Sequence, residues 1–235
     1  RYTNVVADAL QAIPTLSIVT DPGNLFDATT GIYVNAMSDG VLWERATSVE
    51  LISTNAAEGF QINAGLRIRG ASSRNPANPK HSFRLFFRSE YGDAKLDYDL
   101  YGDGGAKDFD ILDLRSAQNY SWGEGYSTQV TLIRELFGRD TQSDMGHPHT
   151  HSTYHHLYMN GIYWGIYQTQ ERVEAYFAET YLGGNEADFD RVKADNSNGL
   201  RVHFPDGNNA AWQETFDLTQ ALGANPIANA SNYWT

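Results

Sequence analysis

The sequence contains no cysteine among its 235 residues, which excludes disulfide bridges and thiolate chemistry. That absence does not decide between the cytosol and the exterior of a cell. Long hydrophobic runs are also missing, and none approaches the roughly 18 apolar residues of a membrane-spanning helix. The formal net charge of −12 disfavours non-specific binding to nucleic acid or anionic lipid, because both are negatively charged. We therefore expect no nucleic-acid partner and no membrane span.

A second absence is local. No Asp or Glu occurs from Gly59 to Ser89, although the whole chain has 29 acidic and only 17 basic residues. Apolar and polar residues alternate in 65–70 and 81–88, and the segment between them is rich in Gly, Ser, Asn and Pro, which predicts two strands joined by a loop. This acid-free window holds six basic residues: Arg67, Arg69, Arg74, Lys80, Arg84 and Arg88.

The basic residues of this window suggest a phosphate site. Side chains alternate along a strand, so Arg67 and Arg69 share one face, and Arg84 and Arg88 share one face. If the strands pair, their guanidinium groups converge beside the loop and Lys80. The guanidinium fork binds oxyanions bidentately and a lysine adds a point charge. The alternative is that these arginines are solvated and pair with the chain's abundant carboxylates. Spacing alone leaves both interpretations open.

The remaining pattern predicts an α+β fold in which strands come first and helices later. Two aromatic, alternating runs flank Asn160-Gly161, the dipeptide that type I′ hairpin turns favour. Other strands are predicted at 15–20, 31–35, 46–53, 111–115 and 191–195. Helices are predicted within 1–13, from Thr128 to about Gly138, at 171–181 with Val173 facing inward, and at 211–222.

Five histidines lie close together at positions 147, 149, 151, 155 and 156. Alternating histidines in an extended segment point to one side, so a zinc or nickel site is one interpretation. No carboxylate at firm ligand spacing joins them, and Pro148 suits a loop. The alternative is a set of surface histidines that titrate near pH 6.5, about the ordinary value. No metal ligand is assigned from the sequence.

Several motifs follow one another between residues 60 and 195. Arg69 to Ser72 reads RG-x-S, and Lys80 to Arg84 reads K-x-S-x-R. Asn160 to Glu171 contains NG-x-Y-x-G-x-Y running into a Glu, and Val192-Lys193 stands where a later Y-K-type element is expected. In this order the motifs resemble those of the spore coat protein H (CotH) kinase-like family.

The resemblance implies an atypical protein-kinase-like fold that transfers phosphate from ATP, with a divalent metal such as Mg²⁺, to Ser or Thr of a protein substrate. Matched residue by residue, it places Lys80 and Arg84 at the nucleotide phosphates, with Arg69 and Ser72 shaping the adjacent loop. Glu171 is expected to orient a cation, as the ion-pair partner of a kinase lysine does. The phosphate-binding set is completed by Ser82 and by Lys193, whose role is less defined.

The family pattern also implies a division of the chain into two lobes. In one respect, however, this sequence departs from the pattern. Residues 1–125 are expected to form a mainly β, nucleotide-facing lobe, and 126–235 the mixed α/β start of a second lobe. The family's D-x-x-x-x-N-like and W-D-x-D-like segments do not occur before Thr235. We therefore expect the catalytic and metal-binding carboxylates further along a longer parent chain, and no catalytic residue is assigned.

Other classes of function stay open. The segment DPGNLFD, followed by GIYVN, resembles the large secreted bacterial branch of the family, which implies an extracellular or cell-surface location. An extracellular binding or structural module for glycan or a surface protein is the main alternative, since Tyr, Trp, Asn and Asp are abundant. A metal-dependent hydrolase built around the histidines is a third. Neither the substrate protein nor the oligomeric state follows from the sequence.

Overall fold

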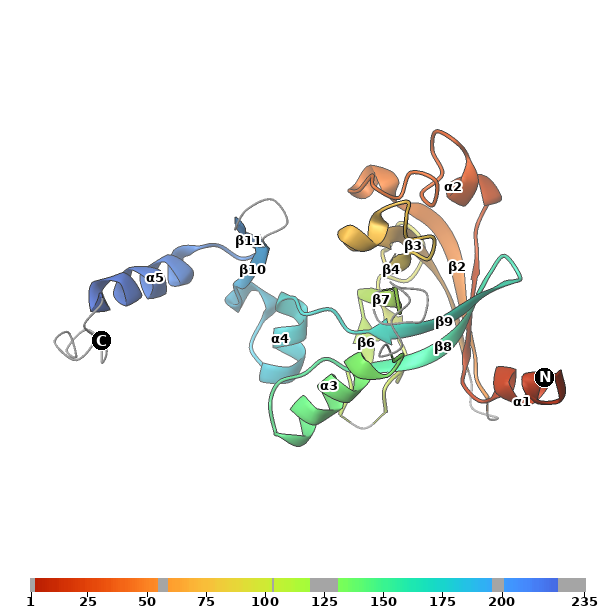
Figure 1. Ribbon diagram of the computed structural model, residues 1–235. Helices are drawn as coiled ribbons and strands as arrows, with labels where there is room; N and C mark the ends of the chain where they lie inside the picture. Colours follow the sequence, from red (N-terminus) through yellow and green to blue (C-terminus); the bar gives the residue numbers. More distant parts are fainter. Residues whose placement is uncertain (1–2, 55–58, 103, 119–130, 196–200, 224–235) are drawn as a thin grey trace. The chain divides into compact units, whose positions relative to one another are not determined.

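The computed structural model of the protein describes residues 3–54, 59–102, 104–118, 131–195 and 201–223 (Figure 1). The chain divides into two compact units, residues 1–172 and 173–235, and each is described by itself. In the described parts, no helix combines the length and the apolar character that crossing a membrane requires.

Seven strands of the first unit close into a barrel, in the order β1-β2-β3-β4-β7-β9-β8. Neighbouring strands are antiparallel, except that β1 and β8 are parallel and complete the closure. The strands are β1 (Thr15–Val19), β2 (Arg45–Ile52), β3 (Phe60–Arg69), β4 (Ser82–Phe86), β7 (Ile111–Ser116), β8 (Ser152–Met159) and β9 (Ile162–Gln170).

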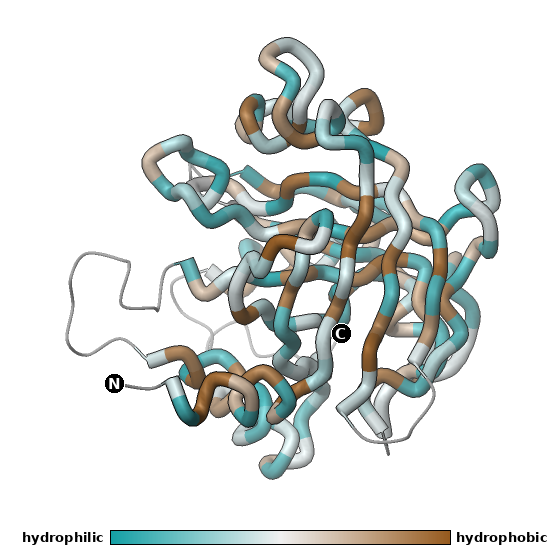
Figure 2. The backbone as a smooth tube through the Cα atoms, turned by 90° about the vertical axis from the view of Figure 1, so that its right-hand side faces the viewer, coloured by the Kyte–Doolittle hydropathy of each residue, from teal (hydrophilic) through white to brown (hydrophobic). Residues whose placement is uncertain are grey.

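The barrel interior is filled by the apolar side of each strand. Because successive side chains point to opposite faces, every second residue of a strand enters the core. Hydrophobic and hydrophilic residues accordingly alternate along the strands in Figure 2. The residues completely withdrawn from solvent include Leu16, Ile18, Leu66, Phe83, Leu85, Leu112, Leu114 and Leu157.

The predicted basic strand pair is confirmed. β3 and β4 are antiparallel, and Arg67 lies directly opposite Arg84 while Arg69 lies opposite Ser82. The predicted hairpin is confirmed as well, since β8 and β9 flank Asn160 and Gly161, whose φ angles are 50° and 77°. Positive φ at both central residues is what a type I′ turn requires.

Shorter elements connect the strands of the first unit. They are η1 (Thr3–Val5), α1 (Val6–Gln11), α2 (Pro22–Phe26), η2 (Val41–Trp43), η3 (Ser72–Arg74), β5 (Leu96–Asp97), β6 (Asp108–Phe109) and α3 (Arg134–Asp144). The second unit contains α4 (Ala175–Leu182), η4 (Glu186–Asp188), β10 (Arg191–Asp195), β11 (Arg201–Asp206) and α5 (Ala210–Leu222). The α+β class is therefore confirmed, with a sheet-dominated core.

Three predicted elements are corrected. Residues 31–35 form a turn instead of a strand, because Ile32 and Tyr33 donate their N–H groups to the carbonyls of Asn24 and Leu25. The helix predicted from Thr128 begins at Arg134 and continues past Gly138, and positions 128–130 lie outside the described residues. Helix α4 starts four residues later than predicted, so the side chain of Val173 precedes it and is exposed.

The compact units do not coincide with the two expected lobes. Strands β8 and β9 belong to the barrel, so the first unit extends beyond residue 125 as far as Arg172. The late hairpin is needed there because β8 is the strand that pairs with β1. The assignment of residues 1–125 to a nucleotide-facing lobe concerns function and stays a prediction.

Candidate functional site

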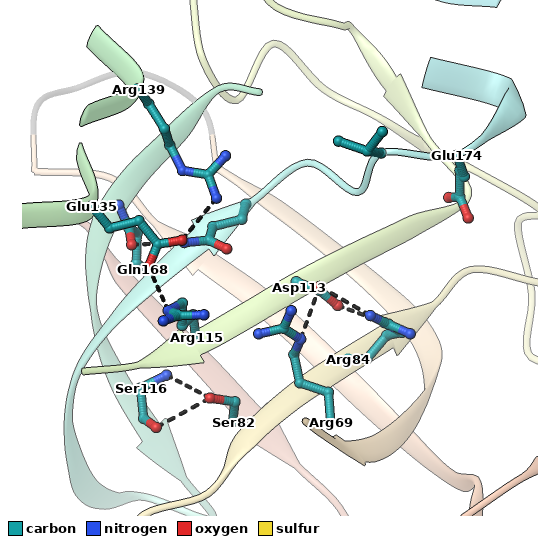
Figure 3. A network of polar contacts seen from close by, with 12 residues as sticks. Arg69, Ser82, Arg84, Asp113, Arg115, Ser116, Glu135, Arg139, Gln168 and Glu174 are labelled. Carbon is teal, nitrogen blue, oxygen red and sulfur yellow. Dashed lines mark hydrogen bonds and ion pairs between the residues drawn. The ribbon is translucent and has the colours of Figure 1, made fainter. Parts of the chain in front are cut away.

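The candidate site is centred on Asp113 of β7, a residue that is 3% exposed. Its side chain lies on the polar outer face of the barrel, which is the side of the sheet opposite to the apolar core. The register places Arg84 of β4 directly opposite it. Arg84 Nε lies 2.5 Å from Asp113 Oδ1, and Arg69 Nε lies 2.9 Å from Oδ2 (Figure 3). Burial lowers the pKa of the Arg69 guanidinium, an effect that the negative charge of Asp113 opposes. Two predicted phosphate ligands thus converge, but on a carboxylate of the protein itself.

The other arginines of the acid-free window also meet carboxylates. Glu44 Oε2 lies 2.5 Å from Arg67 Nη2 and 3.6 Å from Arg88 Nη2. Both guanidinium groups lie over the ring of Phe86 as well, at 4.2 and 4.8 Å from its centroid. Arg74 Nη1 lies 3.2 Å from Asp39 Oδ2. Pairing with carboxylates, the alternative that the sequence left open, is therefore confirmed for these arginines.

Lys80 is held differently. Its ammonium nitrogen lies 5.0 Å from the ring centroid of Tyr167, on β9, and its side chain is half-buried. Burial lowers the pKa of Lys80. Among the described residues, no carboxylate lies within ion-pair distance of it. Lys80 therefore differs from the five arginines of its segment, which all have a carboxylate neighbour.

The remaining predicted ligands are Ser72, Ser82, Glu171 and Lys193, and the two whose contacts within the first unit are described have other partners than Lys80. Ser82 is buried, and its Oγ accepts a 2.9 Å hydrogen bond from the backbone N–H of Ser116. Glu171 Oε2 accepts a hydrogen bond from the backbone N–H of His151 at 2.6 Å and lies 2.9 Å from Nδ1 of the same histidine. Lys193 lies on β10 in the second unit and is exposed. The side chain of Ser72 lies outside the described residues.

Helix α3 adds a second carboxylate to the polar face. Glu135 Oε2 lies 2.5 Å from Arg115 Nε, and Oε1 lies 2.8 Å from Arg139 Nη2 (Figure 3). Gln170 donates to the same Oε1 at 3.1 Å and to the side-chain oxygen of Gln168 at 2.8 Å. The hydrogen bonds from Arg139 and the charge of Arg115 lower the pKa of Glu135, against the effect of burial. This network attaches α3 to β7 and β9 through charged contacts.

Sequence reasoning assigned no role to Asp113 or Glu135. A signal for Asp113 was present, because alternation within Ile111–Arg115 places Asp113 and Arg115 on one face between two core leucines. A carboxylate at such a position can be buried only if a cation pairs with it. For Glu135, the i,i+4 spacing to Arg139 is a local signal, but its partners on β7 and β9 come from distant strands and leave none.

The histidines do not form one cluster: the rings of His149 and His151 lie side by side with centroids 4.7 Å apart, whereas His155 and His156 have other surroundings. His155 points into the barrel, where burial lowers its pKa to about 4. His156 Nδ1 lies 3.1 Å from the hydroxyl of Tyr163, whereas His151 meets Glu171. Within the part of the chain that the structure describes, no three side chains of His, Asp or Glu lie close enough together to hold a metal ion. The geometry thus gives no support to a histidine metal centre.

Comparison with known families matches the sequence to one of them. The sequence model described as CotH kinase protein matches residues 66–226, which is more than half of the chain. The matched stretch begins within β3 and includes β4, β7, the β8–β9 hairpin and most of the second unit. No curated protein matches the chain.

Proposed function

Since the chain belongs to the CotH kinase protein family, we propose that it takes part in transferring phosphate from ATP to a Ser or Thr hydroxyl of a protein. A kinase-like function is what membership of the family itself indicates. The nucleotide, the hydroxyl acceptor and the residues that bind phosphate are the proposal. The observation that carries it is the environment of Lys80.

Phosphoryl transfer asks a protein chiefly to position phosphate and to stabilise its charge. The arginines of the basic segment already have carboxylate neighbours within the fold. Lys80 has instead a neutral aromatic ring beside a half-buried ammonium group. Burial disfavours the charged form of a lysine, so a phosphate oxygen at this ammonium would stabilise it more than it would a fully hydrated lysine. Lys80 is therefore the phosphate ligand that we assign first.

Arg69 and Arg84 are assigned a supporting role. Their guanidinium groups meet at the carboxylate of Asp113. As cations close to the site, they would raise the electrostatic potential for a polyanion such as ATP. Direct contacts from Ser72, Ser82, Glu171 and Lys193 to the nucleotide remain predictions from the family pattern.

The described carboxylates do not fit a metal site of the protein's own. Asp113 and Glu44 are each engaged by two arginines, Glu135 by two more, and Glu171 by His151. Mg²⁺ carried by ATP would have to displace those cations to reach them. We therefore include Mg²⁺ only as part of the ATP complex and assign no residue as its ligand.

The test is the binding of ATP with Mg²⁺ to wild type and to Lys80→Ala, by calorimetry and by the shift in thermal unfolding. Loss of a charged contact should weaken binding by about 1–3 kcal/mol, which is roughly 5- to 150-fold. Lys107→Ala is the matched control, because Lys107 is an exposed lysine 3.4 Å from Asp99. Equal ATP affinity in folded Lys80→Ala and wild type would contradict the assignment.

A transfer assay separates binding from catalysis. Residues 1–235 alone should show no appreciable transfer, because the family's late Asp motifs do not occur in them. In the longer parent chain, radiolabelled γ-phosphate should enter Ser or Thr of a generic protein, and Lys80→Ala should lower that rate while Lys107→Ala leaves it unchanged. If oligosaccharide raises the melting temperature and ATP does not, the extracellular binding module replaces the kinase proposal.

A further inference from the structure

The side chain of Lys80 passes directly over Gly165. Gly165 has a φ of +120°, and a Cβ atom built there would lie 2.2 Å from Lys80 Nζ and 3.2 Å from its Cε. A Cβ at this position would force the end of the Lys80 side chain away from its observed place, because real Cβ atoms essentially never lie within 3.0 Å of such an atom. The hydrogen atom of glycine is what allows the ammonium to lie here.

An irregularity of the β8–β9 ladder produces this glycine conformation. Leu157 pairs with Gly165, but the next residue of β8, Tyr158, pairs with Tyr163, so the ladder skips Trp164. Such a bulge bends the strand and re-aims the side chains next to it. Trp164 packs edge-on against Tyr33, with ring centroids 5.4 Å apart.

Two tyrosine hydroxyls fix the backbone on either side of Lys80. Tyr33 donates to the carbonyl of Pro79 at 2.6 Å, and Tyr167 donates to the carbonyl of His81 at 2.8 Å. The ring of Tyr167 also lies beneath the ammonium, 5.0 Å from it. Tyr167 thus holds both the main chain and the charged end of this segment, and it is only 1% exposed.

We propose that Gly165 and Tyr167 are positioning residues that hold the Lys80 ammonium at the end of the barrel, in the place from which it binds phosphate. The second half of this statement rests on the function proposed above. Gly165 supplies the space, and Tyr167 supplies a neutral, electron-rich surface that tolerates the positive charge without cancelling it. A carboxylate in place of that ring would neutralise the ammonium by forming an ion pair with it.

Lysine NMR tests the positioning without reference to activity. The chain has four lysines, at positions 80, 95, 107 and 193, so protein labelled with ¹³C-lysine gives four Cε–Hε signals, and Lys80→Arg identifies the one from Lys80. The ring of Tyr167 should shift the Lys80 Hε signal upfield of the other three. Because burial lowers the pKa of Lys80, its Cε signal should also titrate at lower pH than theirs. A Lys80 signal that coincides with the exposed lysines in both respects overturns the proposal.

Variants at the two residues complete the test. Gly165→Ala should move the Lys80 signal to the position of the exposed lysines and weaken ATP binding about as much as Lys80→Ala does. Tyr167→Leu should abolish the upfield shift, whereas Tyr167→Phe, which keeps the ring and loses only the hydroxyl, should preserve it. If Gly165→Ala fails to fold, the comparison of Tyr167→Leu with Tyr167→Phe tests the proposal by itself. Equal Lys80 signals in these two variants would overturn it.

ATP added to the labelled wild type separates the two proposals. Movement of the Lys80 signal alone among the four supports the positioning for phosphate. A shifted Lys80 signal in free protein that does not respond to ATP keeps the positioning by Gly165 and Tyr167 but overturns Lys80 as the phosphate ligand.

Discussion

The arginines and the lysine of the basic segment are held in opposite ways, although they occupy one strand–loop–strand unit. Each arginine lies beside a carboxylate that comes from elsewhere in the chain, as Arg84 does with Asp113. Lys80 lies instead against Gly165 and the ring of Tyr167. A buried charge with a counter-charge is satisfied by the fold, whereas a half-buried charge beside neutral groups still gains by meeting an anion. The comparison separates cations that build the fold from a cation that serves a ligand.

Among the changes to the arginines and their carboxylates, removal of Asp113 should lower the free energy of unfolding most. Asp113→Ala leaves Arg69 and Arg84 close together without their shared anion. The free energy of unfolding should fall by about 3–5 kcal/mol, as expected when one partner of a buried ion pair is removed. Urea denaturation at neutral pH, followed by circular dichroism, measures the loss.

Asp39→Ala is the control for that experiment. The Asp39 carboxylate also pairs with an arginine of the segment, Arg74, but its side chain is 78% exposed. An exposed pair contributes only about 0–1 kcal/mol, so this variant should remain close to wild type. Similar losses in the two variants would show that burial of Asp113 does not set its contribution.

His155 resembles Lys80 in this comparison. It is a buried basic group, and no carboxylate is among the groups that shift its pKa. Burial lowers its pKa from 6.5 to about 4, opposed by a hydrogen bond to the backbone of Thr153 and reinforced by His156. As the pH falls, His155 therefore binds a proton near pH 6.5 in the unfolded chain but only near pH 4 in the folded chain. Stability should be unaffected above this window and should fall on the order of 3 kcal/mol as the pH drops through it.

His155→Gln removes the titrating group and should flatten this part of the pH profile of unfolding free energy. His147→Gln, at an exposed histidine, should keep the slope of wild type. The slope between pH 6.5 and 4, and not the absolute stability, is the quantity to compare. An unchanged slope in His155→Gln would place the acid sensitivity in another group.

The smallest effect on stability is expected at Lys80. Lys80→Met keeps an unbranched apolar stem over the ring of Tyr167 and removes only the charge. Because its surroundings contain no described carboxylate that would be left unpaired, the free energy of unfolding should change by less than about 1 kcal/mol. Thermal and urea unfolding measure this change. A loss above about 2 kcal/mol would assign Lys80 to the fold instead of to a ligand.

The parts of the fold that could be predicted are those with local signals. Alternation identified β3 and β4, and Asn160-Gly161 identified the β8–β9 turn, because strand period and turn chemistry are written in consecutive residues. The parallel pairing of β1 with β8 joins distant segments and leaves no such signal. Residues 31–35 resemble a strand locally, but backbone bonds to Asn24 and Leu25 turn them.

The candidate site was predictable to the same extent. Alternation correctly placed Arg69 on the face of the sheet that also carries Arg84. Their common partner could not be foreseen, because the acid-free window excludes a local carboxylate and Asp113 comes from the next strand of the barrel. The place of Lys80 depends on a bulge at Gly165, and a bulge depends on how two strands pair rather than on either strand alone.

Closure of the barrel through β1 and β8 has a consequence for synthesis. β1 ends at Val19, and β8 begins only at Ser152. At ordinary rates of translation, β1 waits on the order of ten seconds for the strand that covers its second edge. During that interval the backbone of β1 can pair with β2 on one side only, and its other edge can accept a strand from a neighbouring chain. The nascent barrel is therefore exposed to misassembly at β1, its first strand, until the β8–β9 hairpin has left the ribosome.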